Sequence, residues 1–298
     1  MSFRLERAYR LYRKRIVRCR TENQLNRVHI ALGNYMTPAE VRYFEAALAG
    51  DPPDSPSCRW IGGLRDLMPT QKIRPIEFQR KGVLKGVTHY TAEVGSREQK
   101  TLILGLAGHF HRLMMPMPCL LNCLNPALFD LIVLRDFSRV LFTSGIPGLG
   151  GDFFEALSNL RRQFDLGSYR NTITLGTSSG GLPALLAAIL LKLDRGISVA
   201  GMDFPEFAAT LQVCGLSEEP YATLLASRPE PFPDLVLVYG KGNAVDAAAA
   251  SALHLCVPSR LWEVKNCDWH TVLAWKLRQQ RLPAFLAKVL GQSLEVNS

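Results

Sequence analysis

Short apolar runs alternate with helix-periodic segments along most of the chain from residue 101 onward. Each run spans about four to seven residues, which is typical of a strand buried on both faces. The expected strands are 101–106, 129–135, 171–175, 197–202, 235–239 and 261–264. The expected helices are 113–128, 153–164, 179–191 and 246–255, with two more closing the chain. This alternation predicts an α/β fold, with a mostly parallel sheet flanked by helices on both faces.

The N-terminal part of the chain has a different pattern. Thr37 and Glu40 form a capping box around Pro38, which opens a helix that stops at Gly50. Residues 51–57 are rich in turn formers and are interpreted as a linker. We therefore divide the 298 residues into a basic helical appendage with its linker, residues 1–57, and a main domain, residues 58–298. Two strand-like segments, at 73–78 and 87–94, begin the main domain.

The net charge of +9 is concentrated at the N-terminus. Residues 1–20 hold eight basic side chains against Glu6, a net of +7, which leaves +2 for the other 278 of the 298 residues. The apolar residues of this segment recur at helical spacing and are Leu5, Tyr9, Tyr12 and Ile16. Such a helix can contact an anionic membrane or a protein partner, or it can pack on the body with its arginines in solvent. No recognised module accompanies the charge, so we expect no nucleic-acid partner.

The cysteines and the apolar runs indicate in which cellular compartment the protein is expected. Seven cysteines occur without paired spacing, and Cys119 and Cys123 have no second pair to complete a zinc site. We interpret them as reduced core thiols and expect no metal. The first twenty residues show no signal-peptide pattern, and the apolar run 182–191 is too short to cross a bilayer. A cytoplasmic location is expected, with attachment to the inner membrane face through residues 1–20 as a variant.

The most informative motif is Gly176-Thr177-Ser178-Ser179-Gly180. A β-branched strand enters it and an Ala- and Leu-rich helix leaves it, which places Ser178 at the apex of a sharp turn. A serine there adopts a strained backbone, so the residues two positions away must be small. The turn exposes the Ser178 hydroxyl and leaves the Ser179 amide free at the start of a helix. A Gly-rich turn without chemistry is the alternative.

A base and an acid are expected beyond the carboxyl ends of later strands. His270 follows the last strand, and Asp246 follows the strand before it. The chain order is therefore Ser178, Asp246, His270. Asp246 lies seven residues beyond Tyr239, farther from its strand than is common, so Asp203 stays open as a rival acid.

This order, with the serine on a strand–elbow–helix, resembles the α/β-hydrolase family over roughly residues 73–291. The resemblance implies that Ser178 is the nucleophile, His270 the general base and Asp246 the orienting acid. It also implies an oxyanion hole formed by the Ser179 amide and by the loop that holds Gly108 and His109. That loop lacks a plain His-Gly-Gly. Residues 203–233, acidic and without regular pattern, have the position of a cap over the pocket.

Two loops border the expected substrate side. Arg135 and Arg139 follow the strand 129–135, and a Gly-rich run at 145–151 precedes a helix. These residues can hold an anionic group at the helix start, or the loop can be a turn capped by Asp152. We expect Arg135 and Arg139 to bind substrate.

The Arg135–Arg139 run, the Gly-rich run and the elbow together also resemble bacterial proteins associated with surface-polysaccharide synthesis, some of which are O-acetyltransferases. This resemblance implies an acyl-transfer enzyme that acetylates a surface polysaccharide, with acetyl-CoA as acyl donor and a glycan hydroxyl as acceptor. The alternatives are a carboxylesterase or deacetylase that uses water, and an inactive hydrolase-fold partner in a glycan-assembly complex. No bound cofactor is expected in any of them.

Overall fold

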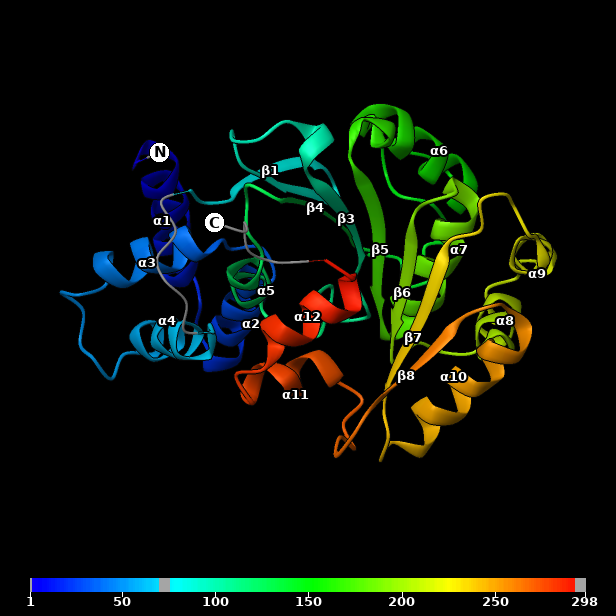
Figure 1. Ribbon diagram of the computed structural model, residues 1–298. Helices are drawn as coiled ribbons and strands as arrows, with labels where there is room; N and C mark the ends of the chain where they lie inside the picture. The colour runs from blue at the N-terminus through cyan, green and yellow to red at the C-terminus, as the bar shows by residue number, and fades with distance from the viewer. Residues whose placement is uncertain (1, 70–75, 293–298) are drawn as a thin grey trace.

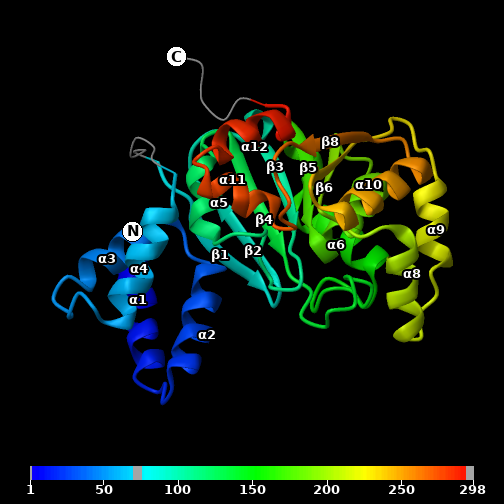
Figure 2. The same cartoon turned by 90° about the horizontal axis from the view of Figure 1, so that it is seen from below.

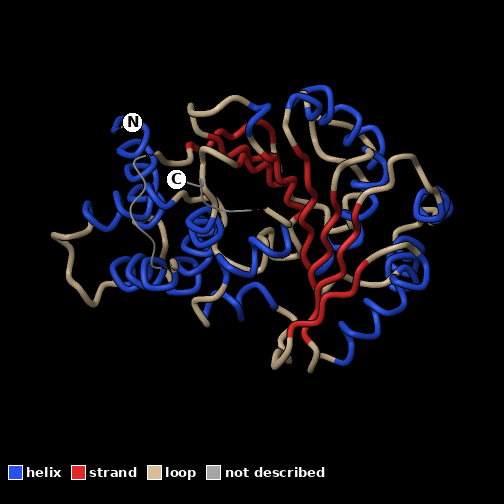
Figure 3. Tube along the Cα trace, in the orientation of Figure 1, coloured by secondary structure: helices blue, strands red, loops and turns tan. Residues whose placement is uncertain are grey.

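A computed structural model describes residues 2–69 and 76–292 of the chain. Its centre is one eight-stranded sheet with the order β1-β2-β4-β3-β5-β6-β7-β8 (Figures 1 and 3). The strands are β1 (Gln79–Leu84), β2 (Val87–Thr91), β3 (Thr101–Leu106), β4 (Phe129–Leu134), β5 (Asn171–Thr177), β6 (Arg195–Val199), β7 (Asp234–Gly240) and β8 (Arg260–Val264). β2 pairs antiparallel with β1 and β4, and all later neighbours are parallel. The predicted α/β class and mostly parallel sheet are confirmed.

Helices cover both faces of the sheet. They are α5 (Met117–Cys123), α6 (Phe153–Phe164), α7 (Gly181–Leu191), α8 (Phe204–Val213), α9 (Glu219–Ala226), α10 (Ala244–Cys256), α11 (Val272–Arg278) and α12 (Leu282–Leu290). Side chains alternate between two cores because successive strand residues point to opposite faces. Leu102 and Leu104 of β3 enter the core shared with α6 and α7, whereas Ile103 enters the core shared with α5 and α12.

Four helices form the appendage at one end of the molecule, beside α5 and the β1–β2 edge (Figure 2). They are α1 (Ser2–Ile16), α2 (Glu22–Gly33), α3 (Pro38–Ala47) and α4 (Pro56–Leu67). The Thr37–Glu40 capping box is present as predicted. α4 begins at Pro56 and places Ile61 and Leu64 in the same small core as α3. The helical appendage therefore continues past the predicted boundary at residue 57.

The apolar stripe of α1 packs inward. Tyr12 is 1% exposed, and its ring lies 5.3 Å from that of Phe44 and 5.7 Å from that of Trp60. Its hydroxyl donates a hydrogen bond of 2.6 Å to Ser57 and contacts His29 Nε2 at 3.1 Å. The apolar face of α1 is therefore buried against the other helices of the appendage. Most of the side chains that α1 exposes to solvent are basic, and Leu11 is exposed among them.

Arg135 joins the appendage to the sheet, which corrects its expected role in substrate binding. Its side chain is 1% exposed and donates to the carbonyls of Asn34 and His111 and to the Thr88 hydroxyl, at 2.7 to 3.0 Å. The guanidinium also lies 4.1 Å from the centre of the Tyr35 ring. A buried guanidinium needs such partners, and satisfying them leaves Arg135 inside the structure.

Three predicted elements differ from the observed ones by more than a few residues at their ends, and β1 is not among the expected strands. The expected strand 73–78 lies partly outside the described residues, and 76–78 are not strand. The expected helix 113–128 shrinks to α5, because Pro116 precedes it and the residue before Pro126 disfavours helix. The segment expected to be irregular, 203–233, forms α8 and α9. Four of its apolar side chains are buried in the core shared with α6 and α7: Phe207, Leu211, Tyr221 and Leu225.

Three of the cysteines lie in the core, as expected for structural thiols: Cys119, Cys123 and Cys267. Cys214 and Cys256 are exposed, and Cys19 and Cys58 are partly so. The core interpretation therefore holds for only part of the set.

Candidate active site

Ser178 lies at the sharp turn between β5 and α7. Its φ is +53°, in the left-handed region that a non-glycine residue rarely adopts. The flanking glycines allow the close packing that this turn needs. A Cβ on Gly176 would run into the carbonyl oxygen of Gly180, and a Cβ on Gly180 would run into that of Leu106. The elbow thus holds the half-exposed Ser178 hydroxyl at the carboxyl end of the sheet.

Two other side chains complete a hydrogen-bonded chain with Ser178. His270 Nε2 lies 2.9 Å from Ser178 Oγ, and His270 Nδ1 lies 2.9 Å from Asp246 Oδ1. An ionised carboxylate only accepts hydrogen bonds, so the Nδ1–H donates to Asp246 and the Nε2 lone pair faces the Ser178 hydroxyl. The arrangement is that of a nucleophile, a base and a group that orients the base.

Local structure explains how Asp246 reaches His270 from seven residues beyond Tyr239. β7 continues to Gly240, and Asn243 then caps α10 by accepting a hydrogen bond from the Asp246 amide at 3.0 Å. Asp246 therefore lies in the first turn of a helix rather than at the end of the strand. The loop before α10 is joined to the histidine loop by a hydrogen bond of 2.8 Å from the Gly242 amide to the Cys267 carbonyl.

Asp203, the rival acid, caps a helix instead of contacting His270. Its carboxylate accepts a hydrogen bond of 2.9 Å from the Glu206 amide and caps α8. The structure brings Asp246, and not Asp203, into hydrogen-bond contact with His270.

The electrostatics of the site centre on His270. Its hydrogen bond to Asp246 raises the pKa of His270 above the ordinary value, burial opposes this, and the charges of Asp246 and Glu206 add to the rise. Glu206, at the start of α8, was missed by the sequence analysis. Its signal was its position three residues after Asp203, in the first turn of the helix that follows β6. Asp246 is 6% exposed, and its Oδ2 is buried without a hydrogen-bond partner among the described residues.

The loop after β3 lies against the nucleophile. A Cβ on Gly108 would lie 2.8 Å from the Thr177 carbonyl oxygen and 3.3 Å from Ser178 Cβ. The Gly108 amide itself donates to the Arg112 carbonyl at 3.3 Å. His109, the next residue, is exposed. On the other side, Ser179 occupies the first turn of a 3₁₀ helix, Ser178–Gly180, where amides have no partner within the helix.

Arg139 is exposed in the loop after β4, with a φ of +59°, and its amide donates to the Asp136 carboxylate at 3.0 Å. Its expected contact with substrate stays a prediction.

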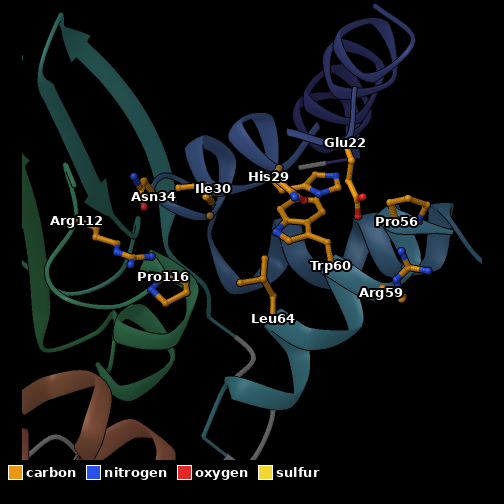
Figure 4. A pocket seen from close by; sticks show the side chains of 12 residues that line it. Glu22, His29, Ile30, Asn34, Pro56, Arg59, Trp60, Leu64, Arg112 and Pro116 are labelled. Atoms are coloured by element: carbon orange, nitrogen blue, oxygen red, sulfur yellow. The ribbon is translucent and has the colours of Figure 1, made fainter. Parts of the chain in front are cut away.

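A separate cavity of about 540 Å³ lies between the appendage and the loop after β3. Figure 4 shows His29 and Trp60 stacked on the appendage side, with Arg112 and Pro116 on the opposite wall. The two stacked rings are 4.3 Å apart at an interplanar angle of 1°. None of Ser178, Asp246 and His270 lines it. This cavity is therefore distinct from the serine site.

Among the described residues, no helix combines the length and the apolar character needed to span a bilayer. In the same part of the chain, no group of three or more His, Cys, Asp or Glu side chains is placed to hold a metal ion.

No family model matches the chain, and no curated protein matches it. Solved structures similar to it include a dienelactone hydrolase from Anabaena variabilis, which is 14% identical with a TM-score of 0.49 and matches 73% of this chain and 99% of the other. Est1E from Butyrivibrio proteoclasticus is 15% identical with a TM-score of 0.43, over 72% of this chain and 99% of the other. The enterobactin esterase of Shigella flexneri is 18% identical with a TM-score of 0.47, over 74% of this chain but only 61% of its own length.

These similarities are too weak to support an argument about activity, and the fold assignment rests on the chain's own geometry. The sheet has one antiparallel edge and a long parallel part, and β5 runs into a strained serine elbow. Asp246 follows β7, and His270 follows β8. These features together identify the chain as an α/β-hydrolase-fold protein.

Proposed function

We propose that this chain is a serine-dependent acyl-transfer enzyme. The observation that carries the proposal is the hydrogen-bonded chain from Ser178 through His270 to Asp246, with two bonds of 2.9 Å. A serine hydroxyl is a weak nucleophile, and a positioned imidazole that accepts its proton makes attack on an acyl carbon feasible at neutral pH. A protein that served only as a partner in a complex would have no need of this alignment.

The first half of the reaction follows from the geometry. As Ser178 Oγ forms a bond to the acyl carbon, its proton passes to His270 Nε2, and Asp246 stabilises the imidazolium. The acyl oxygen, which becomes negatively charged, accepts hydrogen bonds from the amides of Ser179 and His109, because both residues follow the ends of neighbouring strands beside Ser178. When the intermediate collapses, the bond to the leaving group breaks, and that group takes the proton from His270.

The second half decides between transfer and hydrolysis. A hydroxyl-bearing acceptor gives its proton to His270 and forms a bond to the acyl carbon. The bond from that carbon to Ser178 Oγ then breaks, and His270 passes the proton to Oγ, which restores the free serine. With a sugar hydroxyl as acceptor and acetyl-CoA as donor, the chain is an O-acetyltransferase that modifies a surface polysaccharide. With water as acceptor, it is a carboxylesterase or deacetylase. The His270 side chain is 46% exposed, which favours access of water in the absence of a bound acceptor.

A fluorophosphonate probe tests the acyl-transfer proposal. We expect one adduct per chain in the intact mass spectrum, located on Ser178 and absent from Ser178→Ala. An unlabelled, folded wild-type chain would exclude serine catalysis and leave the inactive-partner alternative. A second experiment separates the two acceptors. The chain is incubated with acetyl-CoA in the presence and absence of a deacetylated polysaccharide, and acetate and acetylated glycan are both measured.

A further inference from the structure

A second hollow, away from the serine, lies at the β8 edge of the sheet. It has a volume of about 600 Å³ and is bordered by β8, the turn that follows it, α11 and α12. Four cationic side chains line it: Lys265, Lys276, Arg281 and Lys288. Three aromatic residues line it as well: Trp262, Trp275 and Phe285. A hollow of this size that combines rings with a few charged groups has the character of a small-molecule site.

Three of the four cations lack a carboxylate partner in the part of the chain that the structure describes, whereas the charge of Lys265 acts on Glu263. Glu263 is the acidic residue among those that line it, and Glu263 is already bound by Lys241 Nζ at 2.9 Å. Within residues 2–69 and 76–292, Lys276, Arg281 and Lys288 form no salt bridge. Residues 21–298 carry a net charge of only +2, so this concentration of cations stands out from the surrounding surface.

Lys276 is the most constrained of the four. Its Nζ lies 4.8 Å from the centre of the Trp275 ring and 5.4 Å from that of Phe285. Burial lowers the pKa of Lys276, and the positive charges of Arg281 and Lys288 lower it further. An ammonium held between two rings and repelled by its neighbours is stabilised by an anion placed among them.

α12 adds to the positive potential. Arg281 is its N-cap residue, and Ala284 in its first turn also lines the hollow. In the first turn of α12 the amides of Leu282 and Ala284 have no partner within the helix, Pro283 has no N–H to offer, and the helix dipole makes that end positive. Free amides and cationic side chains together are the groups that bind phosphate oxygens.

We propose that this hollow binds a phosphorylated ligand of nucleotide size. The phosphates are held by Lys276, Arg281 and Lys288, and the aromatic base of the ligand lies against the half-buried rings of Trp262 and Trp275. The charges account for the phosphates, and the two tryptophans that line the hollow account for the base. None of these residues belongs to the serine site, so this proposal does not depend on the proposed function.

ADP binding to the full chain tests the proposal, measured by calorimetry and by quenching of tryptophan fluorescence. We expect saturable binding of one ADP per chain that weakens as salt is raised. Adenosine has the aromatic base but no phosphate, and inorganic pyrophosphate has the phosphates but no base. Each should bind at least about tenfold more weakly than ADP. No binding at millimolar ADP would overturn the proposal. Pyrophosphate that binds as tightly as ADP would overturn the role of the rings.

Two double variants test whether ADP binds in this hollow. Arg281→Ala with Lys288→Ala should weaken ADP binding about a hundredfold, because each exposed cation that contacts phosphate contributes about tenfold. Lys81→Ala with Lys85→Ala removes the same charge from the opposite edge of the sheet and should leave binding unchanged. Equal loss in both pairs would reduce the effect to net charge and overturn the assignment. Circular dichroism and thermal unfolding report in every variant that the chain is folded, whether or not Ser178 reacts with a fluorophosphonate.

Discussion

Asp246 Oδ1 lies 2.9 Å from His270 Nδ1, although the two residues leave neighbouring strands and are 24 positions apart in sequence. A hydrogen bond of 2.8 Å from the Gly242 amide to the Cys267 carbonyl also joins their two loops. Asp203 instead caps α8. Replacing each of these two aspartates by asparagine therefore tests which of them orients His270.

Asp246→Asn should lower turnover by about four orders of magnitude, because an amide can no longer hold the histidine in the tautomer that accepts the serine proton. Asp203→Asn keeps a side chain that can cap α8 and should change turnover less than about threefold. Hydrolysis of a chromogenic acetyl ester measures both, and circular dichroism checks the fold. Full activity in Asp246→Asn would remove this residue from the mechanism.

Substitutions at the elbow separate the roles of two adjacent serines, Ser178 and Ser179. Ser178→Ala should reduce turnover by several orders of magnitude and abolish acyl-enzyme formation, because the nucleophile is gone. Ser179→Ala keeps the amide that we assign to the oxyanion and should stay within about tenfold of wild type. Intact mass spectrometry after a short exposure to the ester detects the acyl group. An acyl adduct on Ser178→Ala would place the nucleophile elsewhere.

Gly108→Ala tests the contact between the loop after β3 and the nucleophile. The new methyl group would lie 2.8 Å from the Thr177 carbonyl oxygen and 3.3 Å from Ser178 Cβ, so backbone on one side must move. Displacing an oxyanion donor costs about two to three orders of magnitude in turnover, and we expect a loss in that range. Gly167→Ala has open space around the added Cβ and is the matched control. Unchanged activity in Gly108→Ala would show that this loop takes no part in catalysis.

The pH profile should carry the signature of His270. Its pKa is raised, chiefly by the hydrogen bond to Asp246, and only the neutral imidazole can accept the serine proton. The kcat/KM should therefore rise with pH through a midpoint above the ordinary histidine pKa of about 6.5. Glu206→Gln removes a charge that adds to this rise, so its midpoint should move to lower pH while the activity plateau is kept. An unmoved midpoint would separate Glu206 from His270.

Local patterns predicted the strands of the sheet except β1, and they selected the three side chains that the structure joins by hydrogen bonds. The elbow is a short-range steric problem that Gly176 and Gly180 solve within five residues, so it could be read from the motif. The order Ser178, Asp246, His270 follows from which strand each residue leaves. The choice between Asp246 and Asp203 was harder, because it depends on which residue caps a helix. Asn243 caps α10 and frees Asp246, whereas Asp203 itself caps α8.

Tertiary packing decided what the sequence analysis missed. Arg135 looked like a substrate contact because it follows a strand, but its burial depends on the appendage, whose Asn34 carbonyl accepts its hydrogen bond.

The helices in 203–233 had a local signal that was overlooked. Phe207 and Leu211 are spaced by four residues, as are Tyr221 and Leu225, and all four are buried. Two short helices separated by turn residues are easily taken for a loop.

The basic face of α1 yields the last prediction. Deleting residues 1–20 would remove Tyr12 from the core of the appendage, so a truncation would confuse loss of charge with unfolding. Four exposed residues without salt bridges in the described chain offer a cleaner change: Arg7, Lys14, Arg15 and Arg18. Each basic side chain near an anionic membrane contributes about 1 kcal/mol. Replacing all four by Gln should abolish flotation with phosphatidylserine vesicles at low salt. Ester hydrolysis should persist, because Ser178, Asp246 and His270 all lie outside the appendage.

The control for this change is an equal loss of charge elsewhere. Replacing the exposed Lys81, Lys85, Arg170 and Lys192 by Gln lowers the net charge by the same amount and leaves α1 intact. Vesicle attachment through α1 requires that this control still float and that high salt release the wild-type chain, since exposed charges are screened beyond about 10 Å at 0.1 M salt. Equal flotation of the wild-type chain and the α1 variant would exclude a membrane role for this face, and its arginines would then serve only to solvate the appendage.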